Sequence, residues 1–396
     1  MIRVPTNRIQ PGMVLAAPIH HPNADDVCLL KTNYVFEPYT ISRLQELGIE
    51  YVWIRHPGFE FLDAQIGQAI PESRESVYRA VRASFTGISQ RTAGAFELRE
   101  YQRVVSNMIL ALVANKDNAV FAERLWSDER ELFAHSSNVA YLSLVIGLRI
   151  RDYVVSERRY VSERDARDLT NLGIGAMLHD LGKLGMGEPW QKVHRLDEAA
   201  DCDEYREHAR RGYSAVCERV EPTAARILLH HHQSFDGRGF PPVKRFHQQR
   251  EAKPLEGSDI HIFSRIVCVA NILDALIGAS AARRLPLAAA LAALRKPALQ
   301  GMFDPVVLDA VYRVVPPFPL STLVDLSDGR SAVVVDLHEE APCQPTVRPI
   351  DPTHTRADSL GEDIDLRLPG APRIVAEGGK STKGYLYTLE SAEMPA

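Results

Sequence analysis

The sequence has little of what marks secreted, membrane and nucleic-acid-binding proteins. Its five cysteines are odd in number and scattered without a Cys-x-x-Cys pair, which argues against a disulfide framework and a thiolate zinc site. No apolar run approaches the roughly 18 residues that a membrane helix needs. The opening residues, MIRVPTNRIQPG, lack the basic and apolar regions of a signal peptide. These absences predict a cytoplasmic protein without membrane insertion.

Excess charge of one sign is also lacking. The 396 residues carry a net charge of −5, so we expect no broad basic surface and neither DNA nor RNA as a partner. Hydrophobic residues make up 45% of the chain and charged residues 24%, which is typical of a folded globular protein. The length suffices for two or three domains.

The spacing of apolar residues divides the chain into five segments. Residues 1–56 combine β-rich runs with one short amphipathic helix, which predicts a small α+β domain. Residues 57–94 are expected to form a helical connector. Residues 95–315 keep apolar positions three and four apart, which predicts one all-helical domain. A β-rich extension follows at 316–376, and 377–396 are expected to be a flexible tail. The predicted fold class is mainly α.

The sharpest local signal is the run MLHDLGK, where His179 and Asp180 end an apolar helix and Lys183 follows. Burying an ionised Asp beside a His costs several kcal/mol unless the pair is hydrogen bonded or holds a cation. Taken alone, such a pair is more often a surface hydrogen bond than a pair of metal ligands.

Further imidazole and carboxylate groups lie in the same helical region. Glu131 and His135 are four residues apart and share one helix face. Later helices contribute three more histidines, His208, His231 and His232. These groups are typical ligands of Mn, Fe or Zn in hydrolytic centres, and a bridging Asp can hold two metals roughly 3.5–4 Å apart. Together they favour a metal centre over isolated structural histidines.

These motifs resemble one known family, the HD-GYP branch of the HD phosphohydrolases, bacterial enzymes that hydrolyse cyclic di-GMP. The similarity covers roughly residues 125–335 and rests on HDLGK, on His208 and on HHQSFDGRGFP. Residues 1–56 are similar to the small domain of unknown role that often precedes this module. The resemblance implies a phosphodiesterase that converts cyclic di-GMP into linear pGpG, GMP or both.

The resemblance also assigns roles within the site. Asp180 would bridge the metal ions, and Lys183 would contact the scissile phosphate or its attacking water. His230 is an extra neighbour that we expect not to be a ligand. Divalent ions activate water and neutralise phosphodiester oxygens. The implied cofactors are two or three such ions, iron or manganese, and the implied ligands are Glu131, His135, His179, Asp180, His208, His231, His232 and Asn271.

Three positions depart from the family pattern. Asn271 stands where a carboxylate ligand is expected, and its uncharged amide oxygen should bind a cation more weakly. Asp274 lies three residues further and is expected to be structural. Gln233 replaces a Glu beside the site, and Phe240 replaces the motif tyrosine and loses its hydroxyl.

Substrate and partner contacts are expected from two further features. Arg283 and Arg284 are candidate clamps for the substrate's phosphates, with simple solvation as the alternative. The motif loop is expected to be a loop or a docking feature for diguanylate cyclase-type or other signalling proteins. It consists of Asp236, Gly237, Gly239, Phe240 and Pro241. A homodimer through the connector helix is left open.

Three functions follow in order of preference. The leading hypothesis is a metal-dependent cyclic di-GMP phosphodiesterase. The first alternative is a catalytically weak or inactive domain that serves as a cyclic di-GMP receptor or a protein-docking module, as Asn271 and Phe240 favour. The second alternative is an HD hydrolase that acts on another nucleotide or phosphate ester.

Overall fold

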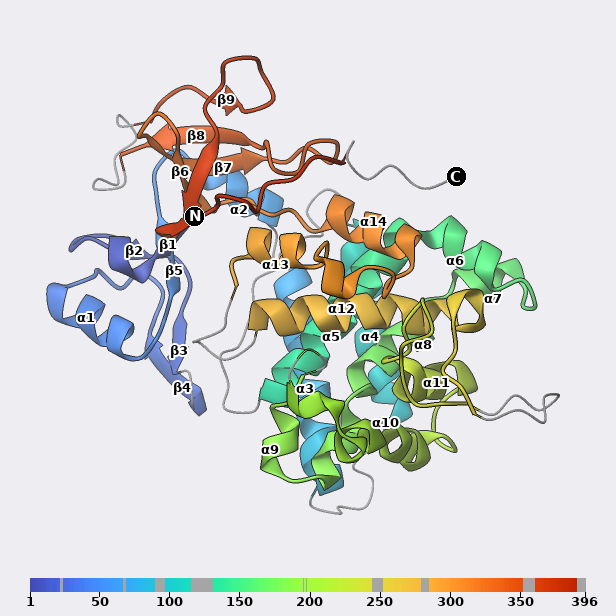
Figure 1. The fold of residues 1–396 in the computed structure, drawn as a ribbon. Helices are drawn as coiled ribbons and strands as arrows, with labels where there is room; N and C mark the ends of the chain where they lie inside the picture. The colour runs from blue at the N-terminus through green and yellow to red at the C-terminus, as the bar shows by residue number, and fades with distance from the viewer. Residues whose placement is uncertain are drawn as a thin grey trace.

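The computed structural model shows a helical domain with two small β-containing units at one end (Figure 1). It describes residues 1–21, 24–66, 69–89, 97–114, 131–194, 196, 198–243, 252–278, 285–351 and 360–389.

The N-terminal unit is a small α+β fold. Its antiparallel sheet has the order β1 (Ile2–Pro5), β5 (Tyr51–Arg55) and β2 (Val14–Leu15), and β3 (Ile19–His21) pairs with β4 (Ala24–Leu30) in a separate ribbon. Helix α1 (Pro38–Glu46) begins with a proline at a position where no backbone N–H is needed. Alternate residues of β1 and β5 enter one core, as the period of two predicts.

Helix α2 (Glu60–Ile66) packs with the N-terminal unit, where Leu62 joins its core. The helical domain holds the remaining helices, which are α3 (Ala69–Ser89), α4 (Leu98–Ala114), α5 (Glu131–Arg149), α6 (Arg151–Glu157), α7 (Glu163–Arg167), α8 (Thr170–Leu178), α9 (Glu188–Gln191), α10 (Asp203–Val216), α11 (Pro222–His230), α12 (Ile262–Gly278), α13 (Leu287–Ala293) and α14 (Pro305–Val314). Helix α5 packs against both α8 and α12. Nearly every described side chain of α8 and α12 is buried, as expected of helices that are apolar on all sides.

Two glycines allow α8 to lie at the centre of this packing. A Cβ on Gly173 would overlap the side chain of Val105 in α4, and a Cβ on Gly175 would overlap Ile227 in α11. Because interiors are densely packed, a methyl group at either position would push α8 away from its neighbours. This matters for function because α8 ends at His179.

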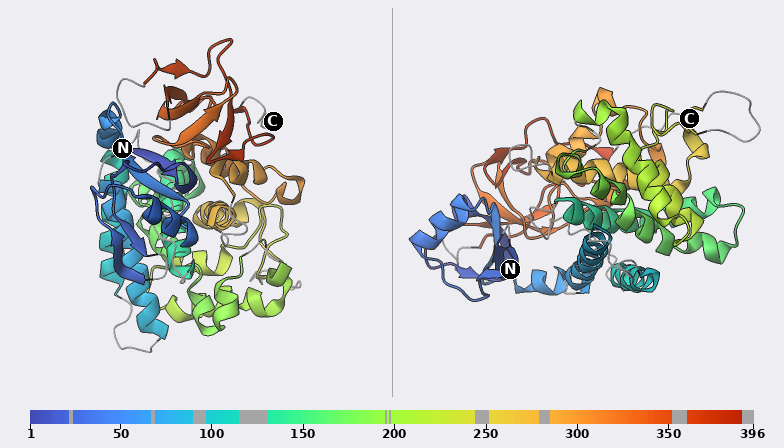
Figure 2. Two further views of the ribbon diagram at one scale, coloured as in Figure 1. Left: turned by 90° about the vertical axis from the view of Figure 1, so that its left-hand side faces the viewer. Right: turned by 90° about the horizontal axis from the view of Figure 1, so that it is seen from below.

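The C-terminal unit is an antiparallel sheet of order β11-β10-β6-β7-β8-β9. Its strands are β6 (Leu323–Leu326), β7 (Ser331–Asp336), β8 (Thr346–Ile350), β9 (Ile364–Asp365), β10 (Ile374–Glu377) and β11 (Lys380–Ser381). Both views in Figure 2 place it beside the N-terminal unit. The two share one hydrophobic cluster, and Arg8 forms an ion pair with Asp325 across them. The N-terminal and C-terminal units therefore pack against each other.

These observations confirm the predicted fold class. In the sequence, the helical domain follows a small α+β unit and precedes a β extension. Among the described residues, no helix combines the length and the apolar character that crossing a membrane requires.

Candidate metal centre

Three histidines of the site are oriented by backbone carbonyls of their own helices. His179 and His231 are the C-cap residues of α8 and α11, where the last carbonyls lack helical partners. Their Nδ1 atoms lie 2.8 Å from the Ala176 oxygen and 2.9 Å from the Leu228 oxygen. In α10, His208 Nδ1 lies 2.5 Å from the Tyr205 oxygen. A carbonyl only accepts, so each Nδ1 carries the proton and each Nε2 is free to bind a cation.

Asp180 lies between two groups of these side chains. Its Oδ1 is 3.4 Å from His208 Nε2 and 3.7 Å from His231 Nε2. One carboxylate oxygen of Asp180 also lies within 4.8 Å of a ring nitrogen of His232. We call His208, His231 and His232 the three-histidine cluster. All four side chains are almost completely buried.

The second group faces the other carboxylate oxygen. Asp180 Oδ2 is 3.6 Å from His135 Nε2 and 3.5 Å from His179 Nε2. The Oδ1 atom of Asn271 in α12 lies 3.0 Å from His135 Nε2. We call His135, His179 and Asn271 the amide cluster. Asp180 therefore belongs to both groups of side chains that could hold a metal ion.

Burial sets the protonation of these groups. It lowers the pKa of His208 to about 3 and that of His135 to about 4, and it also lowers the pKa of His231. Burial opposes ionisation of Asp180, but the Lys183 ammonium and the surrounding histidines hold its pKa well below the ordinary value. At neutral pH the imidazoles of His135, His208 and His231 are therefore uncharged beside the Asp180 carboxylate.

The donor atoms fit divalent cations. His208 Nε2 lies 3.3 Å from His231 Nε2 and 3.1 Å from His232 Nε2, and His179 Nε2 lies 3.3 Å from His135 Nε2. Asp180 Oδ1 is buried and has no hydrogen-bond donor among the described residues. Acceptor atoms that face one another in a dry interior are unfavourable unless a cation lies between them. Imidazole and carboxylate donors suit iron, manganese or zinc.

Lys183 has two partners inside the protein. Its Nζ donates to Asp180 Oδ2 at 2.7 Å and to the Val193 carbonyl at 2.8 Å. The side chain is only 1% exposed, so the ion pair with Asp180 compensates a charge that would otherwise be costly. An ammonium group carries three N–H donors, which leaves one for another acceptor.

Two glycines of the motifs bring backbone close to the histidines. A Cβ on Gly182 would overlap the carbonyl of His208, so only glycine lets this turn touch α10. A Cβ on Gly239 would overlap the His232 carbonyl and the Ser234 nitrogen. The motif loop therefore folds directly back on the three-histidine cluster.

The ring of Phe240 covers this cluster. It stacks on His232 with ring centroids 4.6 Å apart and is 4% exposed. Pro241 is also buried, whereas Asp236 and Arg238 are exposed and paired with each other. Gly237 has a φ of 78°, which suits the turn between them. The aromatic part of the loop thus faces the site.

The Gln233 side chain joins two loops through hydrogen bonds. Its amide nitrogen donates to the Pro241 carbonyl at 2.6 Å, and its amide oxygen accepts from the Leu255 nitrogen at 2.9 Å. A carboxylate at this position could accept but not donate. The amide is therefore the side chain that both partners require.

Asp274 supports the amide cluster from behind. Its Oδ2 lies 2.7 Å from His135 Nδ1, which fixes the ring and leaves Nε2 facing Asp180. A carboxylate behind a metal-binding histidine raises the basicity of the ligand. Asp274, which was expected to be structural, thus contacts His135 through a hydrogen bond and orients its ring.

The predicted site residues separate into two groups. The structure brings together His135, His179, Asp180, Lys183, His208, His231, His232 and Asn271. Among the described residues, His230 belongs to neither group that could hold a metal ion, and its expected exclusion from the ligands stays a prediction. The Glu131 side chain, Arg283 and Arg284 lie outside the described residues, so the roles expected of them stay predictions.

Two site residues were missed by the sequence analysis. His194 is 7% exposed, and its ring centroid lies 5.0 Å from that of His135. Its loop gives no periodic signal that could have placed it. Tyr205 is fully buried 4.7 Å from the His208 ring, and its position three residues before His208 in a helix could have indicated contact.

Comparison with known proteins supports this architecture. Residues 155–307 match the family model of the HD domain. The chain is 26% identical over 274 residues to the cyclic di-GMP phosphodiesterase PA4108 of Pseudomonas aeruginosa, covering 67% of this chain and 60% of that protein. It is 32% identical over 166 residues to the cyclic di-GMP phosphodiesterase response regulator RpfG of Xanthomonas campestris, covering 40% of this chain and 39% of that protein. It thus spans less than two thirds of either relative.

A shorter sequence match and one solved structure were also found. A 3'3'-cGAMP-specific phosphodiesterase of Vibrio cholerae is 32% identical over 107 residues, which cover 26% of this chain and 20% of that protein. Bd1817, an HDG"Y"P protein from Bdellovibrio bacteriovorus, superposes with a TM-score of 0.45 at 15% identity. This covers 78% of our chain and 97% of Bd1817.

The helical core with a buried His-Asp pair defines an HD domain. The spaced histidines and the Asp-Gly-x-Gly-Phe-Pro loop narrow the class further. Residues 155–307 therefore form an HD domain, and the matches support the HD-GYP branch of that family for this helical region.

Proposed function

We propose that the chain is a metal-dependent phosphodiesterase that hydrolyses cyclic di-GMP to linear pGpG, GMP or both. The observation that carries this proposal is the pair of donor clusters that share the buried carboxylate of Asp180. The names of the two cyclic di-GMP phosphodiesterases among the relatives support the substrate.

The proposed cofactors are two divalent ions, iron or manganese, with a third possible if the Glu131 side chain also binds one. The three-histidine cluster and the amide cluster would each hold one ion, with Asp180 shared between them. When bound, such ions supply an activated water at neutral pH and compensate the charge that develops on a phosphodiester.

The protein's own residues would orient the substrate. Two of the three Lys183 donors are used by Asp180 and Val193, and we propose that the third reaches a phosphate oxygen. The Phe240 ring covers His232 and excludes water from that side of the site. Arg283 and Arg284 are proposed as further phosphate contacts, because guanidinium groups bind phosphate oxygens in pairs.

A receptor for cyclic di-GMP is the second candidate. Asn271 favours it, because an amide near His135 contributes no charge to its cluster. Hydrolysis of a related nucleotide is a third candidate, and the name of the Vibrio cholerae relative favours it. Any partner protein that docks on the motif loop would meet Asp236 and Arg238, because Phe240 and Pro241 are buried. A cytoplasmic location and a homodimer stay predictions.

Cyclic di-GMP turnover tests the proposal directly. Protein purified without oxygen and supplied with Fe(II) or Mn(II) should produce pGpG or GMP, detected by chromatography. Asp180→Ala should lower the rate by on the order of 10³-fold or more, because it removes the carboxylate that both ions share. Asp309→Ala, at a half-buried carboxylate outside both groups, is the matched control and should keep full activity.

A second variant separates chemistry from folding. Asp180→Ala leaves Lys183 buried without its carboxylate partner, so Asp180→Ala with Lys183→Met removes both charges. A folded double variant without bound metal would confirm the assignment. Full turnover in either variant would refute the metal centre. Nucleotide binding without turnover in the unmodified protein would make it a receptor.

A further inference from the structure

A buried histidine lies in the segment that joins α9 to α10. His194 is 7% exposed, and among the described residues it belongs to neither group that could hold a metal ion. It is also not one of the motif positions, which are His179, Asp180, His208 and the pair at 231–232. Its role must therefore be inferred from its contacts.

Hydrogen bonds and ring packing fix the position of this segment. The Val193 carbonyl accepts from Lys183 Nζ at 2.8 Å, and the same Nζ donates to Asp180 Oδ2 at 2.7 Å. Trp190 is half-buried, and its ring centroid lies 6.4 Å from that of Tyr205 in α10. The segment is therefore anchored to the metal centre on one side and to α10 on the other, and the residue after Val193 has a defined place.

His194 lies against the amide cluster. Its ring centroid is 5.0 Å from that of His135, with the ring planes at 70°, and this spacing is close to the 5.1 Å between His135 and His179. His135 Nε2 in turn lies 3.6 Å from Asp180 Oδ2, the oxygen that accepts from Lys183. His194 and Lys183 therefore both lie on the Oδ2 side of Asp180.

This side of Asp180 offers two kinds of donor to a phosphodiester. Lys183 has three N–H groups, of which two are used within the protein. An imidazole carries at least one N–H in either protonation state, so the donor capacity of His194 does not depend on its charge. For a metal-activated water to attack, the scissile phosphate must lie next to the ions, whereas the bases lie further away. A donor this close to the amide cluster is therefore suited to the phosphate.

We infer that His194 is a substrate-binding residue whose ring N–H donates to a non-bridging oxygen of the scissile phosphodiester, beside Lys183. The inference rests on the proposed function and names a further contact of the same site. Lys183 supplies charge, and the flat imidazole supplies a donor of fixed direction, because its ring is held by packing on His135. The two together would hold the phosphate in the orientation that attack requires.

Two substitutions separate hydrogen bonding from packing. His194→Phe keeps a flat ring against His135 but removes the N–H donor, and it should lower kcat/KM for cyclic di-GMP by about tenfold or more. His194→Gln returns an N–H donor and should be at least threefold more active than His194→Phe. His338→Phe makes the same change at a half-buried histidine of the C-terminal unit, and it should keep the activity of the parent.

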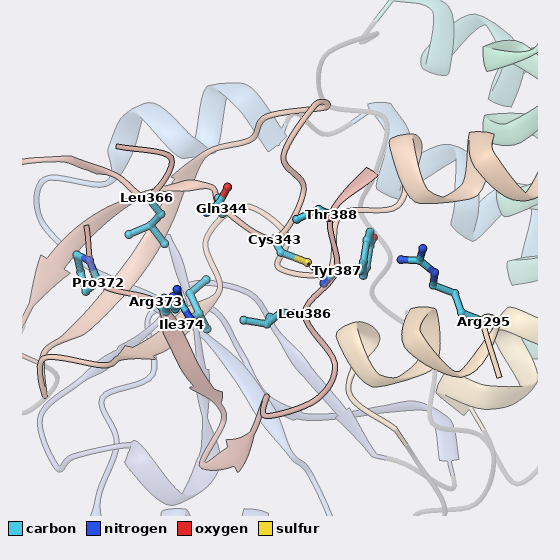
Figure 3. A pocket seen from close by; sticks show the side chains of 10 residues that line it. All are labelled: Arg295, Cys343, Gln344, Leu366, Pro372, Arg373, Ile374, Leu386, Tyr387 and Thr388. Atoms are coloured by element: carbon cyan, nitrogen blue, oxygen red, sulfur yellow. Dashed lines mark hydrogen bonds between the residues drawn. The ribbon is translucent and has the colours of Figure 1, made fainter. Parts of the chain in front are cut away.

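Binding provides a readout that does not need turnover. In EDTA hydrolysis through bound ions stops, and calorimetry with cyclic di-GMP and the full-length chain should give a Kd at least fivefold higher for His194→Phe than for the parent. Leu386→Trp is the control, because it fills a cavity of about 480 Å³ that no metal-centre residue lines. Figure 3 shows Arg295 and Tyr387 at this cavity. The control should leave the Kd unchanged.

Metal content separates a substrate contact from a metal ligand. His194→Phe should hold as many ions as the parent, measured by mass spectrometry after dialysis, because His194 belongs to neither group of described side chains that could bind one. Loss of an ion from this variant would make His194 a ligand and overturn the inference.

The activities decide the remaining alternatives. Parental turnover in His194→Phe would overturn the inference, and so would equal losses in His194→Phe and His194→Gln, which would indicate a packing role. Either result leaves the proposed function standing as long as the parent hydrolyses cyclic di-GMP. A parent that neither binds nor hydrolyses this nucleotide would refute the proposed function, and the inference with it.

Discussion

The two clusters share the carboxylate of Asp180 but differ in the groups that contact its two oxygens. The three-histidine cluster faces Asp180 Oδ1, which has no hydrogen-bond donor among the described residues. The amide cluster faces Oδ2, which already accepts from the Lys183 ammonium at 2.7 Å. A cation in the amide cluster must therefore share its carboxylate oxygen with a nearby positive charge.

The difference indicates unequal affinity for metal. Three imidazoles and one carboxylate oxygen surround the first position, whereas two imidazoles, an amide and the shared carboxylate surround the second. The amide cluster compensates only indirectly, through the hydrogen bond from His135 to Asp274. We therefore expect the three-histidine cluster to bind metal more tightly.

Loss of a ligand from the three-histidine cluster should have the largest effect. His232→Ala should remove one bound ion and leave the other. Affinity at that position should fall by more than the roughly 10–100-fold that loss of an outer-shell partner costs. Metal content measured by mass spectrometry after dialysis checks this. His230→Ala, the neighbouring histidine outside both clusters, should retain both ions.

Loss of a Gln233 hydrogen bond beside this cluster should have the next largest effect. Gln233→Glu should lower the free energy of unfolding by about 2 kcal/mol at neutral pH, because the Pro241 carbonyl loses its buried donor. Chemical denaturation measures the change. Exposed Gln300→Glu is the matched control and should stay within about 0.5 kcal/mol of the parent. Equal stability of the two variants would contradict a stabilising role for the hydrogen bond from Gln233 to Pro241.

One substitution should strengthen metal binding in the amide cluster. Asn271→Asp adds a negative charge 3.0 Å from His135 Nε2 and should raise metal affinity at that position by about tenfold, equivalent to 1.4 kcal/mol. Asn271→Ala should lower it. Metal titration followed by calorimetry separates the two positions. Identical affinities in all three proteins would mean that residue 271 is not a ligand.

A histidine outside both clusters should have the smallest effect. Burial lowers the pKa of His261 to about 4, whereas the unfolded chain binds this proton near pH 6.5. Stability should therefore fall as pH drops from 6.5 towards 4, by about 1 kcal/mol because the ring is partly exposed.

His261→Asn tests this pH dependence. The His261 ring accepts from the Phe263 nitrogen at the start of α12, and Asn can replace that cap without titrating. Chemical denaturation at pH 7 and pH 5 should show a smaller loss of stability in the variant. An unchanged pH dependence would contradict the assignment.

Most of the fold could be predicted from local patterns. Periods of 3.6 and 2 located the helical domain and the two β-containing units, because each element buries one face. The spacing of His179, Asp180, His208, His231 and His232 indicated a metal centre through family resemblance. The role of Gln233 was not predictable, because its partners Pro241 and Leu255 depend on how two loops meet.

The sequence by itself determined the helices, the ligand types and the glycines that close contacts demand. Only the tertiary structure decided which carboxylate oxygen faces which histidines, that Lys183 occupies one side of Asp180, and that His194 lies beside His135. It also placed the N-terminal and C-terminal units in one shared core. Local propensity acts over a few residues, whereas these contacts join segments far apart in the chain and are set by packing.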